Sequence, residues 1–168
     1  MQRLIIALFA EFTTTGEGRM ADPRDPDFEA RVRASFGRQQ FMHTLGATLE
    51  RVIPGEVVIR LPFRPDLTQQ HGFLHAGAIT TVVDSACGYA ALSMMEPGSA
   101  VLSVEFKINL LAPAAGETFL ATGRVVRAGR SLTVCTGEVR AIADGTDRVI
   151  AVMQATMMSV RDRGGLVD

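Results

Sequence analysis

One long helical segment, Ala76 to Met94, dominates the body of this 168-residue chain. Its apolar side chains recur at the spacing of successive helical turns and form one face, made of Ile79, Val82, Val83, Ala86 and Ala90. A second face carries small residues and a single carboxylate, Asp84. Pro97 and Gly98 are helix stop signals. The fold must therefore bury one face of this helix and leave room along the other.

Segments rich in β-branched residues lie on both sides of the helix and predict strands. Before it, residues 47–53 and 56–63 flank Pro54 and Gly55, which is typical of a hairpin. After it come four candidate strands, at residues 101–111, 118–128, 131–143 and 148–160. Because the connections between these strands are short, we expect successive strands to be antiparallel neighbours.

Segment 101–111 alternates between apolar and polar residues, which predicts two distinct faces. The apolar face is expected to hold Leu102, Val104, Phe106, Ile108 and Leu110. The polar face is expected to hold Ser103, Glu105, Lys107 and Asn109. Upstream, residues 27–41 predict one amphipathic helix with a break at Gly37. Together these elements predict the α+β class, with one central helix lying on a single curved antiparallel sheet.

The length of the chain fits one domain, whose core needs neither disulfides nor a structural metal. We expect this domain at residues 26–162, between a peripheral or disordered segment, residues 1–25, and a C-terminal tail, residues 163–168. In the first segment Met20 is an alternative start, and the apolar run before Glu11 is too short to span a bilayer. We therefore expect no membrane partner and no secretion signal.

The charge of the chain indicates which partners it can bind, and its cysteines indicate the compartment in which it works. The net charge is −1 with Lys and Arg spread along the chain, so the basic patch of a nucleic-acid-binding protein is missing. Cys87 and Cys135 each lie inside an apolar segment, which is typical of buried reduced thiols. These features predict a cytoplasmic protein without a nucleic-acid partner.

Asp84 is the residue that most clearly points to chemistry. A carboxylate that is buried without a partner costs several kcal/mol, so Asp84 must be protonated, paired or hydrated in a cleft. The small residues on its face, Gly77, Thr81 and Gly88, favour a cleft. From these residues alone, a structural ion pair and a catalytic role both stay open.

The loop before the helix completes a known pattern. In the family pattern, an Asn is followed after two residues by Gly, after two more by His-Gly-Gly, and an Asp stands nine residues beyond the His. This chain fits the pattern with Gln69, Gly72, His75, Ala76, Gly77 and Asp84. The later segment SVEFKINLLAPA, residues 103–114, agrees too. Over about residues 40–160 the chain resembles the PaaI-like acyl-CoA thioesterases, the phenylacetate-pathway type of the hotdog superfamily.

The resemblance implies a helix wrapped by a curved antiparallel sheet, and two protomers that pair their sheets edge to edge. A dimer of dimers, that is a homotetramer, is common in the family. The active site then lies at the dimer interface, where the aspartate of one subunit faces the His-Gly-Gly loop of the other. The implied substrate is an acyl-CoA, hydrolysed to a free acid and coenzyme A without a cofactor.

The resemblance also implies a role for each matching residue. Asp84 is the nucleophile or general base that attacks the thioester carbonyl, directly or through water. The backbone N–H of Ala76 polarises the carbonyl oxygen, and Ser103 helps to hold the attacking water. His75 shapes the turn. Gln69 replaces the family asparagine with an amide one methylene further out, and Ala76 replaces a glycine but keeps its N–H.

Other assignments concern the coenzyme and a metal. Gly77, at the helix start, and Arg127 and Arg130, around a turn, are expected to contact the coenzyme A part of the substrate, since guanidinium groups bind phosphate well. His71 and His75 with Asp84 suggest metal ligands, but Gly72 and the loop setting disrupt a helical ligand face, so we expect no metal.

Two further functions stay open. One is a hotdog hydratase or dehydratase on hydroxyacyl thioesters, which needs a carboxylate–histidine dyad that His75 and Asp84 do not cleanly supply. The other is a non-catalytic acyl-CoA binding module. Known modules of that type carry a DNA-binding helical domain, whereas residues 1–45 predict one helix and no basic patch.

Overall fold

The computed structural model describes residues 22–161 and 164–165 of the chain. The predictions for residues 1–21, including Met20, and for most of the C-terminal tail concern parts of the chain outside the described residues. The described elements follow the chain as α2 (Phe28–Arg38), α3 (Gln40–Leu45), β1 (Thr48–Ile53), β2 (Glu56–Pro62), η1 (Pro65–Leu67), α4 (Ala76–Leu92), β3 (Ala100–Leu110), β4 (Thr118–Ala128), β5 (Leu132–Ala143) and β6 (Thr146–Val160).

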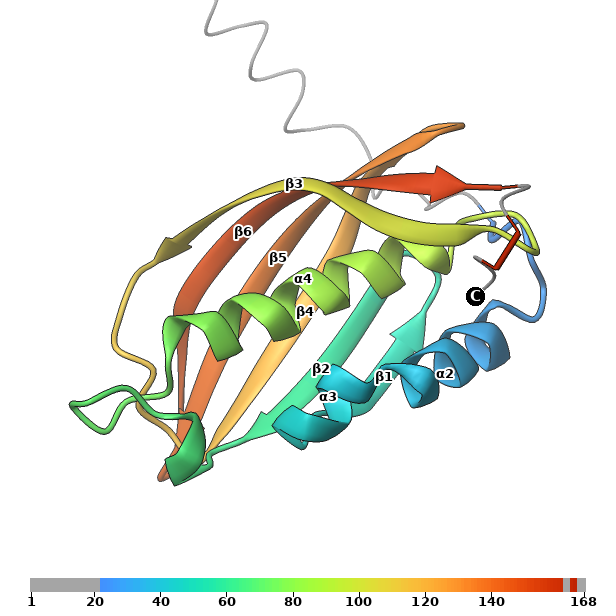
Figure 1. Ribbon diagram of the computed structural model, residues 1–168. Helices are drawn as coiled ribbons and strands as arrows, with labels where there is room; N and C mark the ends of the chain where they lie inside the picture. Colours follow the sequence, from blue (N-terminus) through green and yellow to red (C-terminus); the bar gives the residue numbers. More distant parts are fainter. Residues whose placement is uncertain (1–21, 162–163, 166–168) are drawn as a thin grey trace, which may run out of the picture.

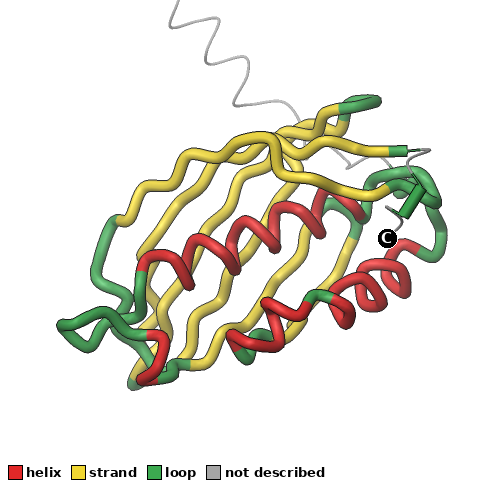
Figure 2. The backbone as a smooth tube through the Cα atoms, viewed as in Figure 1, coloured by secondary structure: helices red, strands yellow, loops and turns green. Residues whose placement is uncertain are grey.

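The strands form one six-stranded antiparallel sheet in the order β1-β2-β4-β5-β6-β3. The sheet curves around α4, while α2 and α3 lie beside it over the β1 and β2 end (Figures 1 and 2). This arrangement confirms the predicted α+β class and the central helix wrapped by a curved sheet. No helix of the described part is long and apolar enough to cross a membrane.

The position of β3 differs from the prediction that successive strands are neighbours. β3 pairs with β6 at the edge of the sheet, and β4 pairs with β2 and β5 instead. The chain must therefore cross three strand spacings between β3 and β4, roughly 14 Å at about 4.8 Å each. Residues 111–117 are long enough for this crossing, since each extended residue spans about 3.3 Å. A short connection therefore does not require neighbouring strands.

The predicted faces of β3 hold from Glu105 to Leu110 but are wrong for Leu102 and Ser103, because the strand contains a bulge. Ser103 pairs with Met157 and Glu105 with Thr156, so Val104 is an extra residue without a partner. The side-chain alternation shifts by one residue there, which places Ser103 and Ile108 on the same, helix-facing side. Without the bulge Ser103 would keep the face predicted for it, opposite Ile108.

Helix α4 buries the predicted apolar face against the sheet: Ile79, Val82, Val83, Ala86 and Ala90 are all at most 1% exposed. The helix ends at Leu92, two residues before the predicted end. Gly123 of β4 allows the close approach, because a Cβ at this position would overlap the backbone of Ala86 and Cys87. Helix and sheet thus touch backbone to backbone at this point.

Gly123→Ala is therefore expected to destabilise the fold by about 3 kcal/mol, since neither backbone can yield easily. A matched control is Gly37→Ala in α2, where nothing lies within 4 Å of the added Cβ. That change should raise stability by up to about 1 kcal/mol through helix propensity. Urea unfolding of both variants measures the difference. Equal stability of Gly123→Ala and the parent would contradict the close approach.

The N-terminal helices differ from the single helix predicted for residues 27–41. The break falls at Gln39, whose extended backbone separates α2 from α3, and not at Gly37. Arg31 of α2 donates hydrogen bonds to the carbonyl oxygens of Leu92, Met95 and Glu96 at 2.9, 2.8 and 2.6 Å. A cation at this position satisfies carbonyl groups at the end of α4. The contact fixes α2 against the central helix.

Candidate active site

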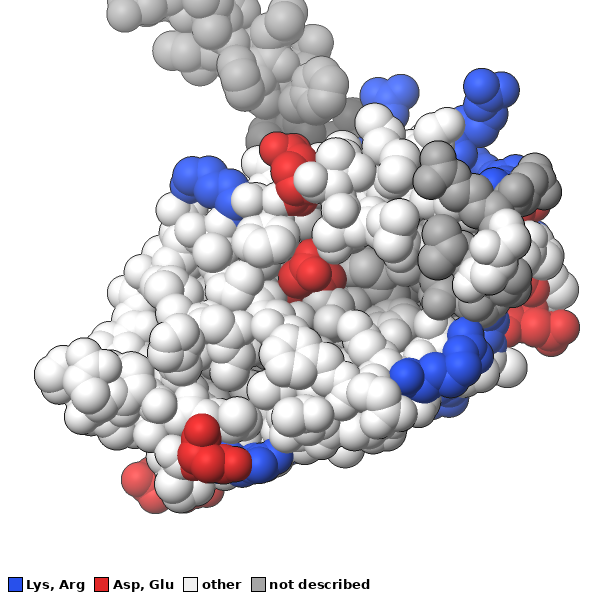
Figure 3. All heavy atoms as spheres, viewed as in Figure 1, with Lys and Arg blue, Asp and Glu red and all other residues white. Residues whose placement is uncertain are grey.

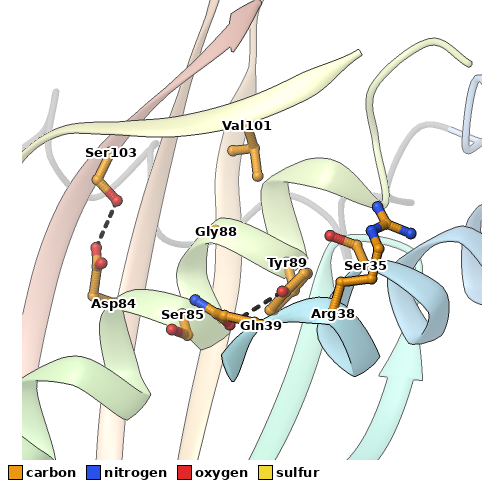
Figure 4. Close-up of a pocket in the computed structure, with 9 residues that line it drawn as sticks. All are labelled: Ser35, Arg38, Gln39, Asp84, Ser85, Gly88, Tyr89, Val101 and Ser103. Carbon is orange, nitrogen blue, oxygen red and sulfur yellow. Dashed lines mark hydrogen bonds between the residues drawn. The ribbon is translucent and has the colours of Figure 1, made fainter. Parts of the chain in front are cut away.

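Asp84 lies midway along α4, where its half-buried carboxylate meets the edge strand. Ser103 Oγ of β3 donates a hydrogen bond of 2.8 Å to Asp84 Oδ1 (Figure 4). Burial raises the pKa of Asp84 above its ordinary value, and the hydrogen bond from Ser103 partly opposes this rise. The carboxylate therefore holds a proton more tightly than a solvated aspartate does, which suits a group that accepts protons.

A cleft of about 320 Å³ opens beside this pair. Figure 3 shows a hollow near the middle of the molecular face turned toward the viewer, with an acidic side chain at its edge. The cleft is lined by Ser35, Arg38, Gln39, Asp84, Ser85, Gly88, Tyr89, Val101 and Ser103. Of these, only Asp84 and Ser103 were assigned a role from the sequence, although Gly88 was recognised as leaving room beside the helix.

The wall contributed by α2 and by Gln39, at the α2–α3 junction, is not predicted by the sequence patterns. Tyr89 of α4 donates a hydrogen bond of 3.1 Å to Gln39 Oε1 at the α2–α3 junction. Its ring also contacts Phe36, with ring centroids 5.7 Å apart. Helical periodicity places Gly88, four residues beyond Asp84, on the face of Asp84, but it rotates Tyr89 about 140° away from it. No sequence signal pairs it with residues 50 positions away.

The start of α4 presents the second group of predicted residues. His75 is the N-cap, and its Nδ1 accepts a hydrogen bond of 2.8 Å from the Gly77 N–H. This contact agrees with the turn-shaping role expected for His75, and it occupies the N–H of Gly77. The N–H of Ala76, the first residue of the helix, has no partner among the described residues. An unpaired N–H at a helix start is suited to polarise a carbonyl oxygen.

Gln69 lies near the same helix end. Its Oε1 accepts a short hydrogen bond from the His71 N–H, which leaves the amide nitrogen as a donor. A second cavity, of about 500 Å³, has a mostly apolar lining: Gln69, Phe73, Leu74, Ala76, Ile79, Leu110, Ala112, Pro113, Ala114 and Ile150. Gln69 and Ala76 thus share one cavity, and Asp84 and Ser103 share another.

The Asp84–Ser103 pair and the Ala76–Gln69 pair form two halves of the predicted site, and they lie apart in one chain. Ala76 and Asp84 are eight residues apart on one straight helix, which corresponds to roughly 12 Å along its axis. A carbonyl group in contact with the Asp84 carboxylate is therefore out of reach of the Ala76 N–H of the same chain. Within one chain, the Asp84–Ser103 pair and the Ala76–Gln69 pair therefore line two separate cavities.

The remaining predicted residues lie elsewhere. Arg127 follows a bulge in β4 and pairs with Val134, which places it on the convex face of the sheet, away from the cleft of its own chain. Arg130 lies exposed in the turn between β4 and β5. In the described part of the chain, no three His, Cys, Asp or Glu side chains gather as a metal site would require.

The two cysteines are fully buried and unpaired, as predicted. Cys135 Sγ donates a weak hydrogen bond of 3.6 Å to the Cys87 carbonyl oxygen. Burial raises the pKa of Cys135 to about 12, so its thiol stays protonated at neutral pH. Such a thiol is not activated as a nucleophile.

Comparison with known proteins finds similarity to thioesterases and esterases. The family model of the "Thioesterase superfamily" matches residues 71–147. Human acyl-coenzyme A thioesterase 13 is 31% identical over 103 residues, which cover 60% of this chain and 73% of that protein. A Saccharolobus solfataricus protein with a provisional esterase name is 34% identical over 80 residues, and the match spans 56% of its length.

Solved structures extend the comparison to most of the chain. A thioesterase family protein from Silicibacter pomeroyi is 52% identical with a TM-score of 0.79, covering 80% of this chain and 99% of that one. The E. coli PaaI protein of the phenylacetic acid degradation operon shares the fold, with a TM-score of 0.72 at 20% identity over 84% of this chain and 97% of that one. This chain belongs to the thioesterase superfamily and has its hotdog fold.

Proposed function

We propose that the protein hydrolyses an acyl-CoA thioester, with Asp84 as the nucleophile or general base. The observation that carries this proposal is the half-buried Asp84 carboxylate, held by Ser103 at the wall of a cleft. As general base, Asp84 takes a proton from water while the water oxygen bonds to the carbonyl carbon. The carbon–sulfur bond then breaks, and coenzyme A leaves as a thiolate that is protonated to the free thiol.

The sparse set of polar groups suits a thioester. A thiolate is a good leaving group, because a cysteine-like thiol has a pKa near ~8.5, and no strong general acid is needed to expel it. The developing negative charge on the carbonyl oxygen does need a donor. The unpaired N–H of Ala76 supplies this donor, with the amide of Gln69 in the same cavity.

We propose further that the Ala76 half of the site comes from a second copy of the chain. β3 is an edge strand with unpaired backbone groups on its outer side. Its large apolar residues are about half exposed: Leu102, Val104, Phe106 and Leu110. Edge-to-edge antiparallel pairing of two β3 strands covers these residues and brings the helix start of one subunit toward the Asp84 of the other. Arg127 and Arg130 remain our candidates for the coenzyme A phosphates.

The hydrogen bonds of His75 and Asp84 do not favour the hydratase hypothesis. His75 Nδ1 is engaged with the Gly77 N–H, and the hydrogen bond that Asp84 accepts comes from Ser103. The carboxylate–histidine dyad of that reaction is therefore not formed within one chain.

Measuring thiol release from short, long and aryl acyl-CoAs tests the proposed reaction. Turnover of at least one acyl-CoA, with equal amounts of free acid and thiol, is the expected result. If acyl-CoA raises the melting temperature but no thiol appears, the protein is a binding module and the proposed reaction is wrong. Hydration of an enoyl thioester with the thioester bond intact would instead identify a hydratase.

Ser103→Ala is expected to shift the pH dependence of this activity. The variant loses the hydrogen bond that lowers the pKa of Asp84, so that pKa rises further. Since the base acts when deprotonated, the acidic limb of the kcat/KM profile should move to higher pH. Thr136→Ala, an exposed change on the convex face of β5, is the matched control. An unchanged acidic limb in Ser103→Ala would contradict this role of the serine.

A further inference from the structure

We propose that the acyl group of the preferred substrate is an unsubstituted hydrocarbon chain, longer than that of hexanoyl-CoA. We propose that this chain occupies the apolar cavity beside Ala76, where the small side chain of Ala112 leaves room for it. This inference rests on the proposed thioesterase function and names the substrate class of the same site. It gives a role to lining residues that the proposed reaction itself does not use.

The first argument is the chemistry of the cavity wall. Among the described residues that line the cavity, Gln69 supplies the single polar side chain, and none is charged. Backbone groups of the wall are already paired: the Leu74 N–H donates to the Ala114 carbonyl oxygen at 3.1 Å, and the Ala112 N–H donates to that of Ile150 at 3.3 Å. A polar or charged group buried against this wall would lack a partner. A hydrocarbon is the ligand that the wall suits.

The second argument is the shape of the cavity. Its lining comes from the start of α4, the loop before it, the end of β3 and the segment that follows β3, which gather at one end of the molecule (Figure 1). The lining side chains of Leu74, Ile79 and Ile150 are at most 3% exposed, whereas those of Phe73 and Leu110 are 37% and 53% exposed. The cavity thus has a buried apolar floor and an exposed apolar rim. A flexible chain can enter it from outside without crossing a polar barrier.

The third argument is the direction in which a bound thioester must extend. When the Ala76 N–H holds the carbonyl oxygen, the carbonyl carbon carries two substituents, the acyl chain and the sulfur of coenzyme A. The coenzyme arm contains amides and phosphates, which would lose their hydrogen bonds in this cavity. The hydrocarbon chain is therefore the substituent that fits there. The cleft beside Asp84 is lined mostly by polar side chains and suits such a chain less well.

The fourth argument is size. The volume of about 500 Å³ is roughly three times that of a cavity that holds one benzene ring. An acetyl or hexanoyl group would leave much of this space unfilled, while each further buried methylene strengthens binding roughly fourfold. Two alanines of the segment after β3, Ala112 and Ala114, line the cavity. Ala112 is half-buried and Ala114 is buried, so Ala112 is the position where a larger side chain can reduce the space with less strain on the fold.

The test compares kcat/KM for acetyl-, hexanoyl- and decanoyl-CoA. We expect the parent enzyme to prefer decanoyl-CoA over hexanoyl-CoA by roughly 10- to 100-fold, because the additional methylenes are partly buried. Ala112→Phe should bring this ratio close to one, and Ala112→Leu should give an intermediate ratio if the larger change prevents folding. Ala115→Phe, at an exposed position outside the cavity lining, is the matched control and should leave the ratio unchanged.

A binding experiment separates this inference from the proposed reaction. Alkyl-CoA thioethers cannot be hydrolysed, and calorimetry measures the affinities of hexyl-CoA and decyl-CoA for the parent and the variants. If no acyl-CoA is hydrolysed but decyl-CoA binds more tightly in a manner that Ala112→Phe abolishes, the inference holds and the proposed reaction fails. If short chains are preferred, or if the folded Ala112 variants keep the parent ratio, the inference is overturned while the reaction stands. Absence of both turnover and binding overturns both.

Discussion

Asp84→Asn is expected to lower kcat/KM for acyl-CoA hydrolysis by roughly 10²- to 10⁴-fold, which is the usual contribution of a positioned general base. The amide keeps the size of the side chain and can still accept the Ser103 hydrogen bond, but it cannot take a proton from water. Thiol release under saturating and limiting substrate measures the loss. A variant that retains more than about a tenth of the activity would remove Asp84 from the reaction.

The same substitution should stabilise the fold at neutral pH. Because burial raises the pKa of Asp84, the native protein binds this proton more tightly than the unfolded chain does. The contribution of Asp84 to the free energy of unfolding therefore falls as pH rises from the ordinary aspartate pKa through the raised one. Asparagine carries no charge to desolvate, so its melting temperature should exceed that of the parent above this window. The gain should vanish at pH values below it.

Ala76→Pro is expected to cause a loss of roughly 10²- to 10³-fold in kcat, because proline removes the backbone N–H that polarises the carbonyl. Proline is well tolerated at the first position of a helix. The preceding residue, His75, already has the extended backbone that proline requires, with φ −62° and ψ 138°. Folding should therefore be retained, as a thermal melt can verify. Ala76→Ser, which keeps the N–H, is the control expected to stay active.

Mixing the two inactive variants tests whether the halves come from different subunits. In a dimer of one Asp84→Asn chain and one Ala76→Pro chain, one site combines Asp84 and Ala76 from their respective parent sequences, and the other site has neither. Random exchange of subunits should then restore about a quarter of the parent activity. No recovery despite demonstrated exchange would place both groups in the same chain, contrary to the roughly 12 Å separation along α4.

The central helix and its buried face follow from the sequence, because the periodicity of Ile79, Val82 and Val83 is a local property. The hairpin of β1 and β2 follows for the same reason. The place of β3 beside β6 does not, because strand pairing depends on contacts between residues about 50 positions apart. The bulge at Val104 is hidden for a related reason, since alternation along one strand contains no information about its partner.

The residues of the candidate site also fall into two groups, those that a local sequence pattern predicts and those that depend on long-range packing. Asp84, His75 and Ala76 belong to one continuous segment and form a recognisable pattern. The Ser103 contact depends on the bulge, and the Arg38 and Gln39 wall depends on how α2 packs against α4. Arg31 secures that packing through the carbonyl groups at the end of α4, but an arginine on an amphipathic helix has no sequence feature that reveals this partner.

The position of the unpaired N–H and the carboxylate at separate points of one rigid helix has a consequence for how the enzyme responds to dilution. An isolated chain carries every group of the site yet cannot align a substrate between them. On the proposal that the two halves of the site come from two chains, turnover is a property of the associated pair, so we expect specific activity to fall once the protein concentration drops below the dissociation constant of the dimer. Under the same proposal, we expect total activity near this dissociation constant to rise more steeply than in proportion to protein concentration, without any regulatory ligand.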